Sequence, residues 1–239
     1  MFFFIKCGVL LFKLLLINKI LTLLLTTGLC NRLKVNLMAK TIYSLYSHFY
    51  DSVFGTLLHP GRCMASELMD IQPGEKILEV GVGTGISLPL YRRDAEVIGI
   101  DISRDMIKQA GEKKQRFGYH NVKLCITDAS EMAFKNNYFD KVIASHSITV
   151  IPKPFETLKE IKRVCKENAE FFFLNYAGSD DNLIAKFEKA LSPIRCRLGL
   201  GKAINLEKLL DSANFHIDFE DRINIFKLVQ LIKCRNNGV

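Results

Sequence analysis

The stretch Ile77-Leu-Glu-Val-Gly-Val-Gly-Thr-Gly-Ile86 decides the fold of this chain of 239 residues. Its first four residues favour a buried strand, and Gly81, Gly83 and Gly85 then interrupt it before a new apolar run begins. Glycine is needed where the backbone takes a positive φ or approaches a ligand closely. The stretch therefore predicts a strand, a tight turn and the start of a helix.

The spacing of the glycines separates this turn from a dinucleotide-binding turn. A G-x-G-x-x-G fingerprint that began at Gly81 would need its third glycine at Ile86. Here the third glycine comes one residue earlier, and the acidic Glu79 lies near the end of the strand.

Glu79-Val-Gly-Val-Gly-Thr-Gly85 resembles motif I of the class I S-adenosylmethionine (SAM) dependent methyltransferases. The run through Ser87-Leu-Pro-Leu-Tyr91 is similar to the bacterial phosphatidylethanolamine N-methyltransferases, and the resemblance covers about residues 43–235. It implies an α/β, Rossmann-like fold with a seven-stranded, mostly parallel sheet, an antiparallel edge strand and helices on both faces. It also implies SAM as the cofactor, S-adenosyl-L-homocysteine as its product, no metal, and cofactor contacts from Glu79, Gly81, Gly83 and Gly85.

The hydrophobic pattern that follows alternates between strands and helices, which is typical of a parallel sheet covered by helices. The predicted strands are residues 76–80, 96–100, 122–126, 141–145, 170–176, 215–220 and 224–232. The predicted helices are residues 41–54, 62–70, 104–117, 155–166, 183–191 and 206–212, with a further helix starting over 87–92.

Charge and composition separate the first 37 residues from the rest. Residues 1–40 carry five Lys and one Arg with no acidic residue, so they hold +6 of the formal net charge of +8. The remainder is nearly neutral, which argues against a nucleic-acid-binding protein. Seven cysteines without a C-x-x-C pair indicate reduced thiols in a cytosolic protein. We expect residues 38–239 to form one methyltransferase domain.

Three interpretations of residues 1–37 stay open. The segment has apolar runs broken by Lys6, Lys13 and Lys19, and its longest uncharged stretch, Ile20 to Asn31, has 12 residues. That is short of the roughly 20 residues that span a bilayer. The segment is a signal peptide, an anchor on a membrane surface, or translated upstream sequence before a start at Met38.

Acidic residues at the ends of two predicted strands indicate an adenosine site. Asp101 can accept hydrogen bonds from both ribose hydroxyls, or it caps the next helix, for which Ser103 is the better candidate. By the resemblance, Asp128 and Ala129 lie against adenine, although Asp128 also suits a turn. Ile102 and Met106 would sandwich the ring, or serve as core.

Other residues are candidates for the reacting end of the cofactor. Ser145 and His146 follow the predicted strand 141–145, where the methyl group would lie, and His146 is either a base or structural. The resemblance implies that a tyrosine-bearing helix closes over the cofactor and the acceptor, with Tyr43, Tyr50 and Asp51 in matching positions. A Tyr or a carboxylate can receive the proton of the acceptor amine, so Tyr50 and Asp51 are the favoured candidates. The tyrosines could equally just pack on the domain.

A stretch near the carboxyl end of the chain suggests which acceptor receives the methyl group. Ser192-Pro-Ile-Arg-Cys-Arg-Leu-Gly-Leu200 matches the phospholipid enzymes, and Arg195 and Arg197 either pair with a lipid phosphate or lie in a solvated loop. We therefore expect a phosphatidylethanolamine N-methyltransferase, cytoplasmic and peripheral at the inner face of the cytoplasmic membrane, with an anionic membrane surface as its partner. The alternatives are methylation of a quinone precursor or another lipophilic acceptor, and SAM binding without catalysis.

Overall fold

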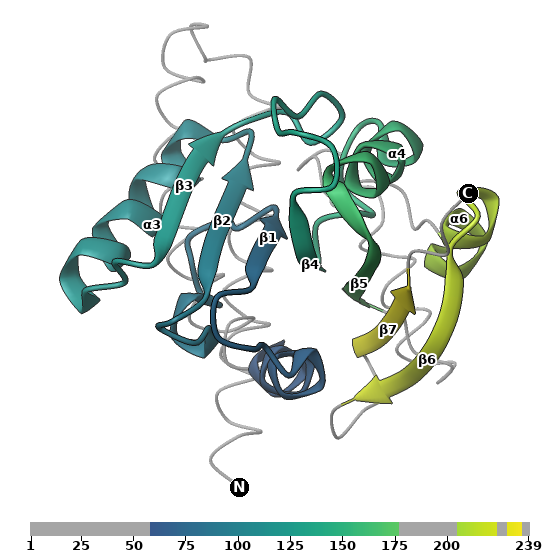
Figure 1. Ribbon diagram of the computed structural model, residues 1–239, viewed down its shortest axis with the longest axis horizontal. Coiled ribbons are helices and arrows are strands. Elements are labelled where there is room, and N and C mark those ends of the chain that lie inside the picture. Colours follow the sequence, from purple (N-terminus) through teal and green to yellow (C-terminus); the bar gives the residue numbers. More distant parts are fainter. Residues whose placement is uncertain (1–57, 177–204, 224–228, 236–239) are drawn as a thin grey trace, which may run out of the picture. The chain divides into compact units, whose positions relative to one another are not determined.

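A computed structural model of the chain describes residues 58–176, 205–223 and 229–235 (Figure 1), which belong to one compact unit, Val53–Val239. The predicted extension 1–37 and the predicted helices 41–54 and 183–191 lie outside the described residues.

The described residues form a single mixed sheet of seven strands in the order β3-β2-β1-β4-β5-β7-β6. The five strands from β1 to β5 run parallel, while β7 is antiparallel to both β5 and β6. The strands are β1 Lys76–Val80, β2 Glu96–Asp101, β3 Val122–Ile126, β4 Phe139–Ser145, β5 Cys165–Tyr176, β6 His216–Ile223 and β7 Val229–Arg235. The predicted fold class is confirmed.

The helices of the described part are residues 58–69, α3 Arg104–Phe117, α4 Pro154–Val164 and α6 Leu206–Ser212, with a short 3-10 helix η1 Leu88–Leu90. Local signals fix the ends of α3. The Ser103 hydroxyl accepts a hydrogen bond from the Met106 N–H at 3.4 Å, and Gly118 ends the helix at a φ of 65°.

Alternation along the strands builds two cores, one on each face of the sheet. In β1, Leu78 and Val80 belong to the core into which α4 and α6 pack, whereas Ile77 belongs to the other core. That second core receives the helix over residues 58–69, and Ile107 of α3 packs against it. By the same alternation Glu79 lies on the Ile77 face, toward the helix over residues 58–69.

Several details differ from the sequence-based prediction, among them the helix predicted over 62–70, which is already formed at residue 58. The predicted helix over 87–92 is only the single turn of η1, because the backbone is already extended at Tyr91. The antiparallel strand β7 lies one position inside the sheet, and the edge strand β6 runs parallel to β5. Strand β5 begins at Cys165, directly after α4, because its start pairs with Phe139 of β4.

No helix within the described ranges is both long enough and apolar enough to cross a membrane. The four cysteines in those ranges, Cys63, Cys125, Cys165 and Cys234, are free thiols.

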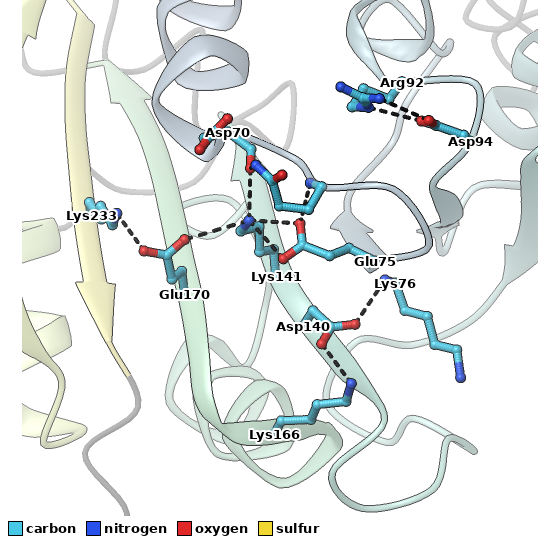
Figure 2. Close-up of polar contacts among 11 residues, drawn as sticks. Asp70, Glu75, Lys76, Arg92, Asp94, Asp140, Lys141, Lys166, Glu170 and Lys233 are labelled. Atoms are coloured by element: carbon cyan, nitrogen blue, oxygen red, sulfur yellow. Dashed lines mark hydrogen bonds and ion pairs between the residues drawn. The ribbon is translucent and has the colours of Figure 1, made fainter.

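A buried lysine ties the amino-terminal ends of the central strands together (Figure 2). Lys141 of β4 is 6% exposed, and its Nζ lies 2.7 Å from Glu75 Oε2 and 3.8 Å from Glu170 Oε2. The same Nζ donates to the carbonyl oxygen of Asp70 at 3.1 Å. Lys233 of β7 pairs with Glu170 in turn, so one network links Glu75, directly before β1, with β4, β5 and β7.

We predict that Lys141→Ala lowers the free energy of unfolding by about 3 kcal/mol, because the partly buried carboxylate of Glu75 loses its cation while Glu170 keeps only Lys233. Urea unfolding followed by circular dichroism measures this difference. As a matched control, Lys123→Ala removes an exposed ion pair with Glu96 and should leave the unfolding midpoint nearly unchanged. Equal effects of the two substitutions would contradict the role assigned to the network.

Candidate active site

The predicted site residues that the structure describes gather where β1, β2, β3 and β4 end. Ligands of open α/β sheets bind in the crevice outside the carboxyl ends of the strands. Glu79 lies in β1, Asp101 ends β2, Ser145 ends β4, and Asp128 follows β3 by two residues. Because these four strands run parallel, their carboxyl ends lie on the same side of the sheet, and the four residues lie there together.

The three glycines of the turn after β1 have different tasks. Gly81 and Gly85 both have a φ of 74°, and a Cβ added to Gly81 would come within 2.4 Å of the Ser147 side chain. A Cβ on Gly85 would come within 3.1 Å of Ala110 in α3. These two glycines allow close packing. Gly83 has a φ of 55°, and its Cβ position has no atom of the described residues within 4 Å, so a ligand can approach the backbone there.

The Asp101 carboxylate connects this turn to the turn after β2. Its Oδ2 accepts a hydrogen bond from the Gly83 N–H at 3.0 Å, and its Oδ1 accepts one from the Ser103 N–H at 2.8 Å. Ser103 is the cap of α3, as predicted, so Asp101 has no capping role. A carboxylate can accept about four hydrogen bonds, which leaves capacity for ribose hydroxyls.

Apolar and acidic groups border the region where an adenine ring is predicted. Ile102 is 66% exposed, which excludes the interpretation of this side chain as core. Met106 is partly buried and Ala129 is buried. Asp128 is exposed, and its Oδ1 accepts hydrogen bonds from both the N–H and the hydroxyl of Ser130 at 2.8 Å. Asp128 is therefore exposed and also stabilises the turn after β3. Its contact with adenine stays a prediction.

Glu79 is almost fully buried beneath the glycine turn, at 1% exposed. Burial raises the pKa of its carboxyl group to about 7, against the hydroxyls of Tyr91 and Ser87 and the charge of Arg62, which all lower that pKa. Its Oε2 has no hydrogen-bond partner within the described part of the chain. A buried, unsatisfied acceptor of this kind suits a cationic ligand group.

Ser145 and His146 stand at the end of β4 with polar atoms that are buried and lack a partner among the described residues, Ser145 Oγ and His146 Nε2. His146 has a φ of 58°, which is uncommon for a residue other than glycine, and its N–H donates to the carbonyl oxygen of Leu174 at 2.8 Å. Burial, assisted by the charge of Arg62, lowers the pKa of His146 to about 3. The imidazole is therefore neutral at physiological pH, a weak base that can still accept a hydrogen bond.

The remaining predicted site residues lie outside the described residues: Tyr43, Tyr50, Asp51, Arg195 and Arg197. Two residues that the sequence did not single out belong to the site, Arg62 and Tyr91, whose charge and hydroxyl act on Glu79. No local signal marked Arg62, because it was the first residue of the predicted helix 62–70 and the buried face that it shares includes Leu58, outside that helix.

The residues fit SAM. Gly83 leaves the backbone open, Ile102 offers an apolar surface beside the Asp101 carboxylate, and Glu79 offers a buried acceptor. The apolar surface suits the adenine ring of SAM, the Asp101 carboxylate suits its ribose hydroxyls, and the buried acceptor suits its ammonium group. No group of three metal-ligating side chains is found in the described ranges.

Comparison with known proteins gives the same picture at the level of the family. A family model described as a methyltransferase domain matches residues 71–213. The phosphatidylethanolamine N-methyltransferase of Cereibacter sphaeroides is 36% identical over 161 residues, which cover 67% of this chain and 79% of that protein. The ubiquinone/menaquinone biosynthesis C-methyltransferase of Ectopseudomonas mendocina is 24% identical over 199 residues, covering 78% of this chain and 77% of that protein.

A solved structure shares the fold. The SAM-dependent methyltransferase from Aquifex aeolicus superposes with a TM-score of 0.57 at 18% identity, covering 73% of this chain and 89% of that one.

We predict that Asp101→Ala weakens SAM binding about 100-fold or more, because charge-assisted hydrogen bonds are worth roughly 1.5–3 kcal/mol each. Isothermal titration calorimetry measures the dissociation constant. Asp105→Ala, an exposed position in the first turn of α3, is the matched control and should bind normally. Unchanged affinity of the Asp101 variant would refute the ribose assignment.

Glu79→Gln should stabilise the protein at alkaline pH. The pKa of Glu79 is raised from 4.5 to about 7, so the folded state keeps a proton that the unfolded state has already lost between these values. Stability therefore falls as pH rises through this window, by an amount on the order of 3 kcal/mol. Thermal melting should show a higher Tm than wild type at pH 8 and a similar Tm at pH 4, together with weaker SAM binding. A Tm difference independent of pH would contradict this account.

Proposed function

The chain belongs to the SAM-dependent methyltransferases, and on that premise we propose that it methylates the amine of phosphatidylethanolamine and of its N-methyl derivatives, towards phosphatidylcholine. The observation that carries the proposal is the 36% identity to a phosphatidylethanolamine N-methyltransferase, over most of both chains. Two features of the described site agree with the proposal. Its residues suit SAM, and the uncharged imidazole of His146 can accept a hydrogen bond from an amine.

The transfer is an in-line displacement at carbon, and it asks the protein mainly to hold the two reactants in line. Correct positioning is worth up to roughly 7–11 kcal/mol. SAM supplies an activated methyl group when bound. Glu79, Gly83 and Asp101 would hold it, and Ser145 and His146 would border the methyl group and accept hydrogen bonds there.

The acceptor nitrogen must be an uncharged amine when it attacks. With a pKa of about 3, His146 holds a proton poorly, so it suits orienting the amine better than removing its proton. We propose Tyr50 and Asp51 as the groups that receive the proton, directly or through water. Both lie outside the described residues.

The lipid requires a phosphate partner and access from a membrane. We propose that Arg195 and Arg197 pair with the lipid phosphate. We also propose that the protein is cytoplasmic and binds the inner face of the cytoplasmic membrane through anionic lipids. The Lys and Arg residues among the apolar residues 1–40 support this, because such segments bind anionic surfaces.

A second candidate function is methylation of a quinone precursor. It is favoured by the similarity to a ubiquinone/menaquinone biosynthesis C-methyltransferase, which covers a larger share of this chain at lower identity. The acceptor atom is then a ring carbon, and no lipid phosphate is required. SAM binding without transfer is the remaining alternative.

We predict that purified full-length protein transfers label from methyl-labelled SAM into phospholipid when vesicles contain phosphatidylethanolamine. Chromatography of extracted lipids measures the label. Vesicles of phosphatidylglycerol alone are the control and should stay unlabelled, as should the phosphatidylethanolamine vesicles with the Asp101→Ala variant. Bound SAM with no label in phospholipid would refute the proposal, and label in an added demethylquinone would support the second candidate.

A further inference from the structure

Arg62 lies on the buried face of its helix. In the helix over residues 58–69, Leu58, Ala65 and Met69 are buried and belong to one core. Arg62 follows Leu58 by four positions and precedes Ala65 by three, so it shares their face. Its Nε and Nη1 atoms are buried. A guanidinium in such a position costs several kcal/mol of desolvation unless nearby groups compensate it.

Contacts of Gly61 and Ser66, on either side of Arg62 in the chain, show which segments border this part of the helix. The Cβ position of the adjacent Gly61 is 3.3 Å from Leu174 Cδ2, and the Leu174 carbonyl oxygen accepts the hydrogen bond from His146. One turn later, the Ser66 hydroxyl donates to the carbonyl oxygen of Leu90 at 2.9 Å, next to Tyr91. Arg62 thus lies between the segment that carries His146 and the segment that carries Tyr91, on the face toward which Glu79 points.

The charge of Arg62 acts on the polar groups at the ends of both central strands. Burial raises the pKa of Glu79 and of Tyr91 and lowers the pKa of His146; the charge of Arg62 opposes the first two shifts and adds to the third. The other groups that act on Glu79 are the hydroxyls of Tyr91 and Ser87, which favour its ionised form, and Asp101, which opposes that form. A buried positive charge favours an anion and disfavours a cation, so one residue has both effects.

We propose that Arg62 is a positioning residue of the cofactor pocket, which holds Glu79 as a carboxylate for the ammonium group of the cofactor. The inference rests on the proposed cofactor. A carboxylate at Glu79 suits a ligand with a sulfonium and an ammonium charge, because it attracts both charges. Without Arg62, Glu79 keeps its proton to higher pH and His146 gains one more easily.

The test compares Arg62→Gln and Arg62→Met with wild type by two measurements. The first is the affinity for S-adenosylhomocysteine, which carries the same ammonium group, by calorimetry between pH 5.5 and 9. The second is the pKa of His146 without ligand, by NMR of histidine ring protons, with His146→Asn for assignment. Wild type should gain affinity as pH rises to about 7, where Glu79 ionises. In both variants the midpoint should rise by about one pH unit, with about fivefold weaker binding at pH 7, and the pKa of His146 should rise by about one unit.

Two further variants separate charge from packing. Arg62→Lys keeps the charge and should keep the midpoint, and Arg93→Gln removes an exposed arginine, which donates to the Gly118 carbonyl oxygen, and should change neither readout. Met suits the apolar face of the helix, so Arg62→Met should fold even if the Gln variant does not. Normal binding by wild type with an unchanged midpoint and unchanged His146 pKa in Arg62→Met would overturn the role of Arg62 alone. Wild type that binds no S-adenosylhomocysteine would instead overturn the proposed function.

Discussion

The two hydrogen bonds of the Asp101 carboxylate are the interaction on which the candidate pocket depends. One oxygen accepts from the N–H of Gly83 and the other from the N–H of Ser103, at 3.0 and 2.8 Å. The turn after β1 and the start of α3 are therefore fixed relative to each other. With the turn held, Gly81 and Gly85 pack against their neighbours while Gly83 stays open. The parallel register of β1 and β2 places these turns side by side at the same edge of the sheet.

Stability and function are separated along the strands of the sheet. At the amino-terminal ends, the Lys141 network satisfies its charges with partners on neighbouring strands (Figure 2). At the carboxyl ends, Glu79, Ser145 and His146 have buried polar atoms without a partner in the described part of the chain. Such atoms cost free energy in the ligand-free fold, and a ligand that satisfies them recovers that cost. The same burial raises the pKa of Glu79 to about 7, because it disfavours the charged carboxylate.

The sequence predicted those parts of the structure that depend on local patterns. β1, β3, α3 and α6 have the predicted ends, since apolar periodicity, the Ser103 cap and the Gly118 stop are all local signals. The single turn of η1 and the interior position of β7 were missed. The extended backbone at Tyr91 has no breaker residue to mark it, and the place of β7 depends on pairing across the sheet. The partners of Lys141 lie 66 and 29 positions away along the chain, and no periodicity predicts such contacts. The site was predicted as a set of strand ends, while the charge of Arg62 became visible only with the packing of its helix.

The central claim is that the ends of β1, β2 and β3 form one adenosyl pocket, and amide chemical shifts test it most directly. Two-dimensional NMR of 15N-labelled protein titrated with S-adenosylhomocysteine should show its largest shifts at Gly83, Ile102 and Ala129. The amides around Lys141 and Glu75, at the opposite ends of the strands, should stay unchanged. Saturable binding with the largest shifts away from these three strand ends, or no binding at all, would contradict the account.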